Sequence, residues 1–163
     1  MLDIVIIGSG PAGLSAAIYG SRSGLDVLVI EKISHGVGQI AEADCINNYL
    51  GFSSIRGFEL GMQFRTHAEA CGVRFQESEA IKLERTDACW KIYAKDGSCI
   101  QSKTVIYAAG ASHRHLNVFG EEALIGKGVS YCATCDGTFY KGKDVAVIGG
   151  GNTAVGDALY LSD

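Results

Sequence analysis

The sequence predicts an α/β fold in which buried parallel strands alternate with helices, with a small antiparallel β-meander and the start of a second unit of the same kind. Three observations lead to this prediction. An apolar, β-branched run leads into a glycine-rich turn and a helix near the start of the chain, two central segments alternate apolar and polar residues, and a second apolar run precedes a second glycine-rich turn near residue 150.

The first unit opens with an apolar strand over residues 4–7, the pattern of a parallel strand buried on both faces. A G-x-G-x-x-G turn follows it. Pro11 then begins a helix, where its missing N–H group costs nothing, and Gly24 ends that helix. A second strand over residues 27–30 completes a β-α-β unit and runs into an acidic residue, Glu31.

Each glycine of the first turn has a physical purpose. Gly8 permits the tight turn, Gly10 lets the backbone approach a pyrophosphate, and Gly13 lets helix and strand pack closely. The N-terminus of the helix supplies N–H groups and a partial positive charge for the phosphates. Glu31, about 20 residues beyond the glycines, is placed to hold a ribose hydroxyl. The unit therefore predicts a Rossmann-like, dinucleotide-binding domain.

The middle of the chain changes its period. Residues 57–71 have the spacing of a helix with one buried side. Residues 80–87 and 89–97 alternate apolar and polar positions, which predicts two antiparallel strands. Asp96-Gly97, at the end of the second segment, predicts a hairpin turn. The run over residues 103–110 predicts a return to the buried parallel sheet.

A second glycine-rich turn follows a predicted strand over residues 145–148. It reads G-x-G-x-x-A over residues 149–154 and leads into a helix with apolar positions up to Leu161. The sequence stops one helix into this unit. We therefore expect a second, nucleotide-type domain that is unfinished, with part of its apolar surface uncovered.

Composition and charge limit the classes of function. The chain has 163 residues, is 47% hydrophobic and 20% charged, and carries a formal net charge of -4. This balance argues against nucleic acid or an anionic membrane as the main partner. The apolar start lacks a basic region and is interrupted by Asp3, and nothing reaches the ~18 apolar residues of a membrane span. We expect a cytoplasmic protein whose cysteines are mostly reduced.

The pair Cys132 and Cys135, in "YCATCDG", leaves three interpretations open: a metal clamp, a redox-active pair, or two buried thiols. His113 and His115 precede the pair, so a zinc site of the His-x-His plus CxxC kind is one alternative. The chain has no second CxxC, and we expect no metal site. The other cysteines are scattered and are expected to be ordinary packed or partly exposed thiols: Cys45, Cys71, Cys89 and Cys99.

Two dinucleotide turns with a CxxC between them form a far more specific pattern than any part alone. From its first residue to its last, the chain resembles the N-terminal part of the low-molecular-weight thioredoxin reductases, which are flavoproteins with two dinucleotide domains. The segments that carry the resemblance are "GSGPAGLSAAIY", Gly38-Gln39, "INNYLGF", "TVIYAAGASHR", "GVSYCATCDG" and "VAVIGGGNTA".

The resemblance implies a domain organisation and an activity. Residues 1–113 would be an FAD-binding domain that lacks its C-terminal segment, residues 117–163 would start an NAD(P)-binding domain, and residues 111–118 would be the hinge. The activity would be that of an FAD-dependent thioredoxin-disulfide reductase, passing reducing equivalents from NADPH through FAD and the dithiol to thioredoxin or a similar small dithiol protein. A homodimer is the expected assembly.

The resemblance also implies site residues. Cys132 would attack the partner disulfide, Cys135 would face the flavin, and Asp136 would protonate the leaving thiolate, although Asp136 as a simple helix-start cap stays open. The expected FAD-binding residues are Gly8, Gly10, Pro11, Ala12, Gly13, Glu31, Gly38, Gln39, Asn48, Ala80, Ala109 and Gly110. The expected NADPH-binding residues are Gly149, Gly151, Asn152, Thr153 and Ala154.

The chain departs from the family pattern at several positions. Leu50 and Phe119 replace usual prolines, and Gly156-Asp157 replaces a usual pair of glutamates in the last helix. The segments that would complete both domains lie beyond the sequence, so we expect weak FAD binding and little turnover of NADPH by these residues alone. Two alternatives stay open: a flavoprotein disulfide reductase fed by ferredoxin or belonging to a peroxide-reducing system, and a non-catalytic, nucleotide-binding remnant.

Overall fold

The computed structural model describes residues 1–162 and divides the chain into two compact units, Met1–Ala111 and the part from Ser112 onward. The first unit is a mixed α/β domain with one six-stranded sheet. The second unit is small and helical. Each unit is described by itself below.

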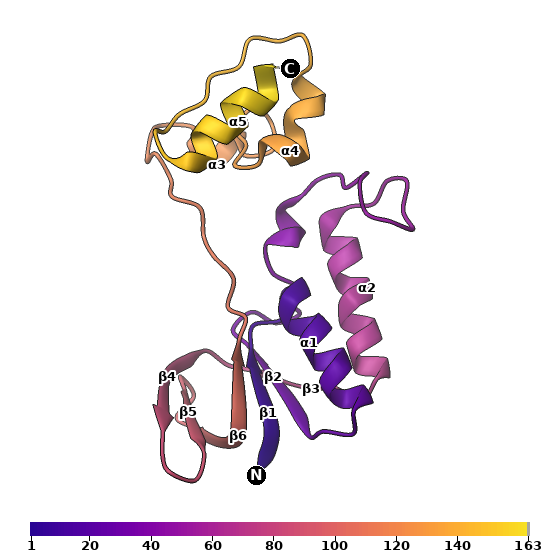
Figure 1. Ribbon diagram of the computed structural model, residues 1–163, viewed down its shortest axis with the longest axis vertical. Coiled ribbons are helices and arrows are strands. Elements are labelled where there is room, and N and C mark those ends of the chain that lie inside the picture. The colour runs from indigo at the N-terminus through magenta and orange to yellow at the C-terminus, as the bar shows by residue number, and fades with distance from the viewer. Residues whose placement is uncertain (163) are drawn as a thin grey trace. The chain divides into compact units, whose positions relative to one another are not determined.

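The sheet of the first unit has the strand order β3-β2-β1-β6-β5-β4 (Figure 1). The four strands β3, β2, β1 and β6 are parallel, and β5 and β4 continue the sheet as antiparallel neighbours. The strands are β1 (Leu2–Ile7), β2 (Val27–Glu31), β3 (Arg74–Glu77), β4 (Ala80–Arg85), β5 (Trp90–Ala94) and β6 (Cys99–Tyr107). The predicted α/β class with a small antiparallel meander is confirmed.

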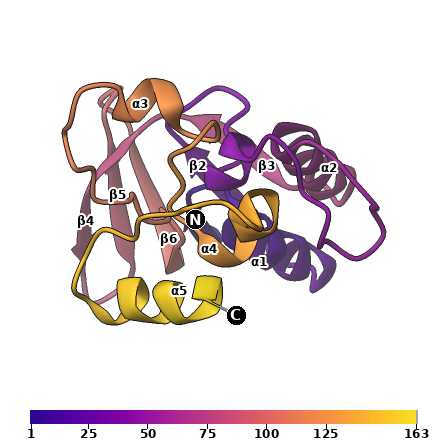
Figure 2. The same cartoon turned by 90° about the horizontal axis from the view of Figure 1, so that it is seen from above.

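Both faces of the parallel strands are covered, as their continuous apolar sequence predicts. The helices α1 (Pro11–Arg22) and α2 (Gly57–Ala70) lie side by side on one face (Figures 1 and 2), where Ile6 and Val29 pack against Leu14 and Ala68. Successive residues of a strand point to opposite faces. The alternate residues of the same strands therefore form a second cluster, in which Val5, Ile7 and Ile30 pack with Ile92 of β5.

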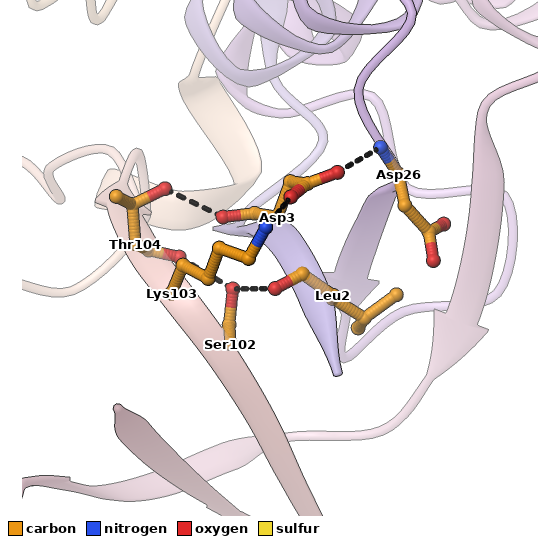
Figure 3. Close-up of polar contacts among 6 residues, drawn as sticks. All are labelled: Leu2, Asp3, Asp26, Ser102, Lys103 and Thr104. Carbon is orange, nitrogen blue, oxygen red and sulfur yellow. Dashed lines mark hydrogen bonds and ion pairs between the residues drawn. The ribbon is translucent and has the colours of Figure 1, made fainter. Parts of the chain in front are cut away.

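Strand β6 joins the two halves of the sheet. Ser102 is fully buried and pairs with Leu2 on the parallel side and with Trp90 on the antiparallel side. At this end of the sheet, Thr104 Oγ1 donates to the Asp3 carbonyl oxygen at 2.8 Å and Lys103 Nζ lies 2.6 Å from the Asp3 carboxylate (Figure 3). The strand predicted over residues 103–110 is observed over residues 99–107. It starts earlier than predicted because residues 99–102 pair with β5, and it ends earlier as well.

The second unit contains α3 (Glu121–Leu124), α4 (Ala133–Asp136), a 3₁₀ turn over Gly137–Tyr140 and α5 (Asn152–Ser162). The prediction of a strand over residues 145–148 was wrong. These residues are in no regular structure, and the side chains of Val145, Val147 and Ile148 are exposed. A strand needs a neighbour to satisfy its N–H and C=O groups. Among residues 112–162 the only β pairing is a single bridge between Ile125 and Val129.

Candidate functional site

The first glycine turn lies where β1 ends, beside the ends of β2 and β6. Gly8 has a φ of 101°, a conformation that favours glycine, and its N–H donates to the Ile30 carbonyl oxygen at 2.9 Å. A Cβ on Gly8 would lie 2.3 Å from the carbonyl oxygen of Ala108, the first residue after β6. The turn is therefore closed on both neighbouring strands by backbone alone.

Three further glycines keep this turn free of side chains. A Cβ on Gly13 would lie 2.0 Å from the Gly8 carbonyl oxygen, so only glycine lets α1 pack this closely onto β1. Gly38, with a φ of 77°, brings its backbone against Gly10, and a Cβ on Gly38 would lie 2.7 Å from the Gly10 Cα. The structure thus brings Gly38 against the glycine turn, in a backbone cradle whose shape suits a pyrophosphate, and a role for Gly38 in binding FAD stays a prediction.

The start of α1 points its free N–H groups at this cradle. The first intrahelical hydrogen bond runs from Leu14 N to the Gly10 carbonyl oxygen at 2.9 Å, so the N–H groups of Ala12 and Gly13 precede it. Pro11 occupies the first helical position and the first turn carries no acidic residue. Such a helix start stabilises an anion through its N–H groups and its dipole.

Glu31 ends β2 with its carboxylate held in place. Its Oε2 accepts hydrogen bonds from the Ser9 N–H at 2.9 Å and from the Ser9 hydroxyl at 2.8 Å, while Oε1 accepts from the Ile33 N–H at 3.1 Å. Partial burial by itself would raise the pKa of Glu31, but the hydrogen bonds from Ser9 and Ile33 outweigh it and hold the pKa below its ordinary value. The carboxylate is therefore an oriented acceptor.

Ser9 is the residue that sequence reasoning missed in this unit. It is fully buried, and its Oγ also lies 2.5 Å from the Gly36 carbonyl oxygen. Ser9 thereby ties the glycine turn to both Glu31 and the loop after β2. The G-x-G pattern gives no signal for this role, because the middle position is unspecified. The one sequence feature that could have indicated it is a small polar residue among the apolar and glycine residues that surround it.

The other predicted FAD-binding residues surround the same end of the sheet to different degrees. Ala109 and Gly110 follow β6 closely in an irregular segment, and Gln39 starts a short 3₁₀ helix (Gln39–Glu42) next to Gly38. Ala80 opens β4 shortly after Ser78, whose N–H donates to the Glu31 carbonyl oxygen at 2.9 Å. Asn48 is exposed in a loop closed by the bridge between Ile46 and Ile55, so its part in the site stays a prediction.

In the second unit, Cys132 and Cys135 form a disulfide with an S–S distance of 2.10 Å. Cys132 caps the start of α4, and the Asp136 N–H donates to its carbonyl oxygen at 3.1 Å. Among residues 1–162 no three His, Cys, Asp or Glu side chains come together as a metal site would require. His113 instead stacks on the Tyr131 ring, with centroids 4.7 Å apart.

The surroundings of the disulfide differ from one alternative and one expectation drawn from the sequence. The Asp136 carboxylate accepts a hydrogen bond from Ser130 Oγ at 2.5 Å, and Ser130 Oγ accepts from the Cys132 N–H at 3.1 Å. Asp136 therefore binds back across the cysteine turn instead of capping a helix start. Cys132, which the resemblance makes the attacking and therefore the exposed cysteine, is half-buried, whereas Cys135 is exposed. Cys132 lies between Ser130 and Thr134, whose hydroxyl is 3.4 Å from its sulfur.

A buried acid precedes the cysteine turn and was also missed. Glu121 is 5% exposed, and its carboxylate accepts hydrogen bonds from the N–H groups of Leu116 and Asn117 and from the Tyr131 hydroxyl. These donors lower the pKa of Glu121, the Tyr131 hydroxyl most, and the same bond raises the pKa of Tyr131 to about 12. Within the predicted hinge, residues 111–118, Leu116 and Asn117 are thus hydrogen-bonded to Glu121 of the second unit.

The second glycine turn leads into α5 as predicted. Gly149 has a φ of 140°, and the Val155 N–H donates to the Gly151 carbonyl oxygen at 3.1 Å. Asn152 opens the helix. The predicted NADPH-binding residues, which all fall within 149–154, therefore lie together at the start of one helix, and a role for them in binding NADPH stays a prediction.

Comparison with known proteins identifies the family. Residues 2–163 match the family described as "Pyridine nucleotide-disulphide oxidoreductase". The chain belongs to this family. It is 42% identical over 160 residues to a thioredoxin reductase of Mycoplasma genitalium, covering 98% of this chain and 50% of that protein. It is 44% identical over 164 residues to a protein of Clostridium pasteurianum described as a "34.2 kDa protein in rubredoxin operon", covering 99% and 52%.

The fold of the chain agrees with that of solved relatives. The crystal structure of a thioredoxin reductase from Streptococcus pyogenes superposes with a TM-score of 0.92 at 42% identity, over 99% of this chain and 52% of that one. The chain spans about half the length of the curated relatives it matches. None of the helices formed by residues 1–162 has the length and apolar character needed to cross a membrane.

Proposed function

We propose that the protein to which these residues belong is an FAD-dependent thioredoxin-disulfide reductase. It would carry reducing equivalents from NADPH through FAD and the Cys132–Cys135 pair to thioredoxin or a similar small dithiol protein. The observation that supports this most is the disulfide between Cys132 and Cys135. It occurs in a chain whose first unit has a glycine turn after β1 that is free of side chains. A cytoplasmic homodimer is the setting we propose for this activity.

The residues of the first unit fit FAD. Gly8, Gly10 and Gly13 leave room for a pyrophosphate at the start of α1, and the carboxylate of Glu31 is oriented as a hydrogen-bond acceptor for a ribose hydroxyl. Bound FAD would supply a two-electron reductant for a disulfide. The twelve residues predicted to bind it, from Gly8 to Gly110, stay a proposal that ligand binding has to test.

The chemistry at the cysteine turn is a balanced two-electron exchange. Breaking the Cys132–Cys135 bond takes two electrons and two protons and leaves two thiols. One of these, as a thiolate, then attacks the partner's disulfide, forms a mixed disulfide and expels the partner's other sulfur as a thiolate. The second cysteine attacks the sulfur of the first, which re-forms the Cys132–Cys135 disulfide and releases the partner as a dithiol. Asp136 lies on the same turn, hydrogen-bonded to Ser130, and is the acid that we propose moves a proton at the leaving sulfur.

The experiment that tests this proposal is the visible absorption spectrum of the purified chain before and after addition of FAD and desalting. Flavin absorption bands that persist after desalting would support FAD binding at the glycine turn, and a colourless protein would favour the non-catalytic alternative for these residues. Alkylation with and without dithiothreitol tests the relay independently. The wild type should gain two reactive thiols on reduction, whereas Cys135→Ser should gain none from this pair.

A second candidate differs in its electron donor. Gly156-Asp157 stands in α5 next to the second glycine turn, at the place where the family usually carries two glutamates. This change favours a flavoprotein disulfide reductase fed by ferredoxin or acting in a peroxide-reducing system. Reduction of the flavin in the whole protein by NADPH alone would refute this candidate, and reduction by reduced ferredoxin alone would support it.

A further inference from the structure

Glu121 makes an unusual set of contacts for a residue that touches neither cysteine. Its carboxylate is almost completely buried and accepts three hydrogen bonds, from Leu116 N at 2.9 Å, from Asn117 N at 2.7 Å and from the Tyr131 hydroxyl at 2.6 Å. The first two donors belong to the segment that enters the second unit. The third belongs to the residue immediately before Cys132. Glu121 therefore joins the entry segment to the cysteine turn.

Tyr131 is held from several sides by the same cluster. His113 stacks on its ring with an interplanar angle of 3°, and His115 Nδ1 lies 3.1 Å from its hydroxyl oxygen. His115 Nδ1 also lies 3.7 Å from the Glu121 carboxylate. We refer to these four residues, His113, His115, Glu121 and Tyr131, as the clasp. Because Tyr131 and Cys132 share a peptide bond, the clasp fixes the backbone from which Cys132 projects.

Restraining one side of a short thiol ring changes its redox equilibrium. Opening the disulfide frees the backbone around Cys132 unless something else holds it, and that gain in conformational entropy favours the dithiol. The clasp removes part of this gain, since it holds Tyr131 through bonds that do not involve either sulfur. It therefore keeps the two thiols close together and favours the disulfide.

We propose that Glu121 and Tyr131 are positioning residues for the Cys132–Cys135 pair: their hydrogen bond holds the entry to Cys132 and makes the disulfide harder to reduce. The inference rests on the proposed function of this pair as a thiol–disulfide relay. It assigns the entry segment a second role besides connecting two units. The part of the predicted hinge that lies within the clasp, from His113 onward, then belongs to the machinery that sets the redox potential of the pair.

The test is a redox titration of the purified chain in glutathione buffers. Each disulfide reduced consumes two glutathione thiols and yields one glutathione disulfide, and mass spectrometry of the alkylated peptide reports this pair apart from the other four cysteines. Tyr131→Phe removes only the hydroxyl, and Glu121→Gln keeps the size of the side chain. Tyr160→Phe is the matched control, because Tyr160 is an exposed tyrosine of the same unit, in α5.

We expect Tyr131→Phe and Glu121→Gln each to lower the equilibrium constant for disulfide formation about three- to tenfold, a tenfold change being about 30 mV for this two-electron couple. Tyr160→Phe should leave it unchanged. The double variant should shift it by less than the sum of the two single effects, because both act through one hydrogen bond, which Tyr131→Phe removes and Glu121→Gln weakens by taking away its charge. Far-UV circular dichroism and a thermal melt show whether each variant keeps its fold.

Two results would overturn the inference. One is a Tyr131→Phe variant that keeps its fold and has the wild-type equilibrium constant, even if its melting temperature falls, since a purely structural bond would affect only stability. The other is a double variant whose shift is the sum of the single shifts, which would indicate general loosening of the unit. The titration needs no flavin, so a failure to retain FAD would count against the proposed function and leave this comparison intact.

Discussion

Replacement of Gly13 by alanine tests whether the packing of α1 on β1 depends on the absence of a single methyl group. Gly13 lies in the first turn of α1 and is buried. Its added Cβ would lie 2.0 Å from the Gly8 carbonyl oxygen and 3.4 Å from the Ile6 side chain. The close neighbour is backbone, which has no alternative rotamer. The helix must therefore move away from the strand.

The structure sets the size of the effect. Ordinary contact begins at 3.4 Å, so the 2.0 Å approach is short by 1.4 Å. A shift of that size loosens Leu14 and Ala17, the residues by which α1 packs on the sheet. Overpacking of a core typically costs 1–3 kcal/mol. Because the neighbour is backbone, we expect Gly13→Ala to lower the free energy of unfolding by about 2–3 kcal/mol, at the upper end of that range.

Urea unfolding of the chain, followed by the fluorescence of Trp90, measures this loss. Trp90 is the only tryptophan and packs against the buried cluster on the second face of the sheet, so it reports on the first unit. Ser15→Ala, at an exposed position of the same helix, is the control and should change the free energy of unfolding by less than about 0.5 kcal/mol. A Gly13→Ala variant as stable as this control would refute the packing argument.

Three further predictions concern the glycines and the held acid. Gly10→Ala places a Cβ at 3.6 Å from Gly38, an ordinary contact, so stability should fall by less than about 1 kcal/mol while FAD affinity, measured by flavin fluorescence quenching, falls at least tenfold. Glu31 has a lowered pKa in the folded state, so its hydrogen bonds stabilise the fold above the ordinary value of 4.5 and this stability is lost as the pH falls below it. Glu31→Gln should therefore flatten the unfolding free energy between about pH 5 and pH 3, and an unchanged acid limb would contradict the role of Ser9. Gly156→Ala, in open space within α5, should raise that helix's stability by about 1 kcal/mol, seen as a stronger circular dichroism signal at 222 nm; no increase would show that the fold requires glycine there.

The sequence predicts the first unit well because several local signals agree there. The apolar run before Gly8, the proline at the helix start and the acid at Glu31 each indicate the same β-α-β unit, and the structure contains it. The turn at Asp96-Gly97 was equally readable, since Gly97 adopts a φ of 86° that few other residues tolerate. Agreement between independent local signals is what made these elements predictable.

The errors arise where the outcome depends on a distant partner. Residues 145–148 have a strand's composition but no strand beside them among residues 112–162, so they stay irregular. Residues 99–102 extend β6 only because β5 lies next to them. Ser9 and Glu121 hold parts of the site through hydrogen bonds with residues in other segments. Ser9 is the unspecified position of the G-x-G motif, and Glu121 belongs to no motif. Spacing along the chain carries no information on such contacts.

The position of β6 at the centre of the sheet has a consequence for how the chain is made. Its partner β1 leaves the ribosome long before it, since Leu2 pairs with Ser102, 100 residues later. Pairings of such large sequence separation close slowly. The nascent chain therefore carries β1 with one edge open until Tyr107 has been synthesised and released. That open edge is a site for pairing with another chain, so the first unit is most prone to aggregation during synthesis.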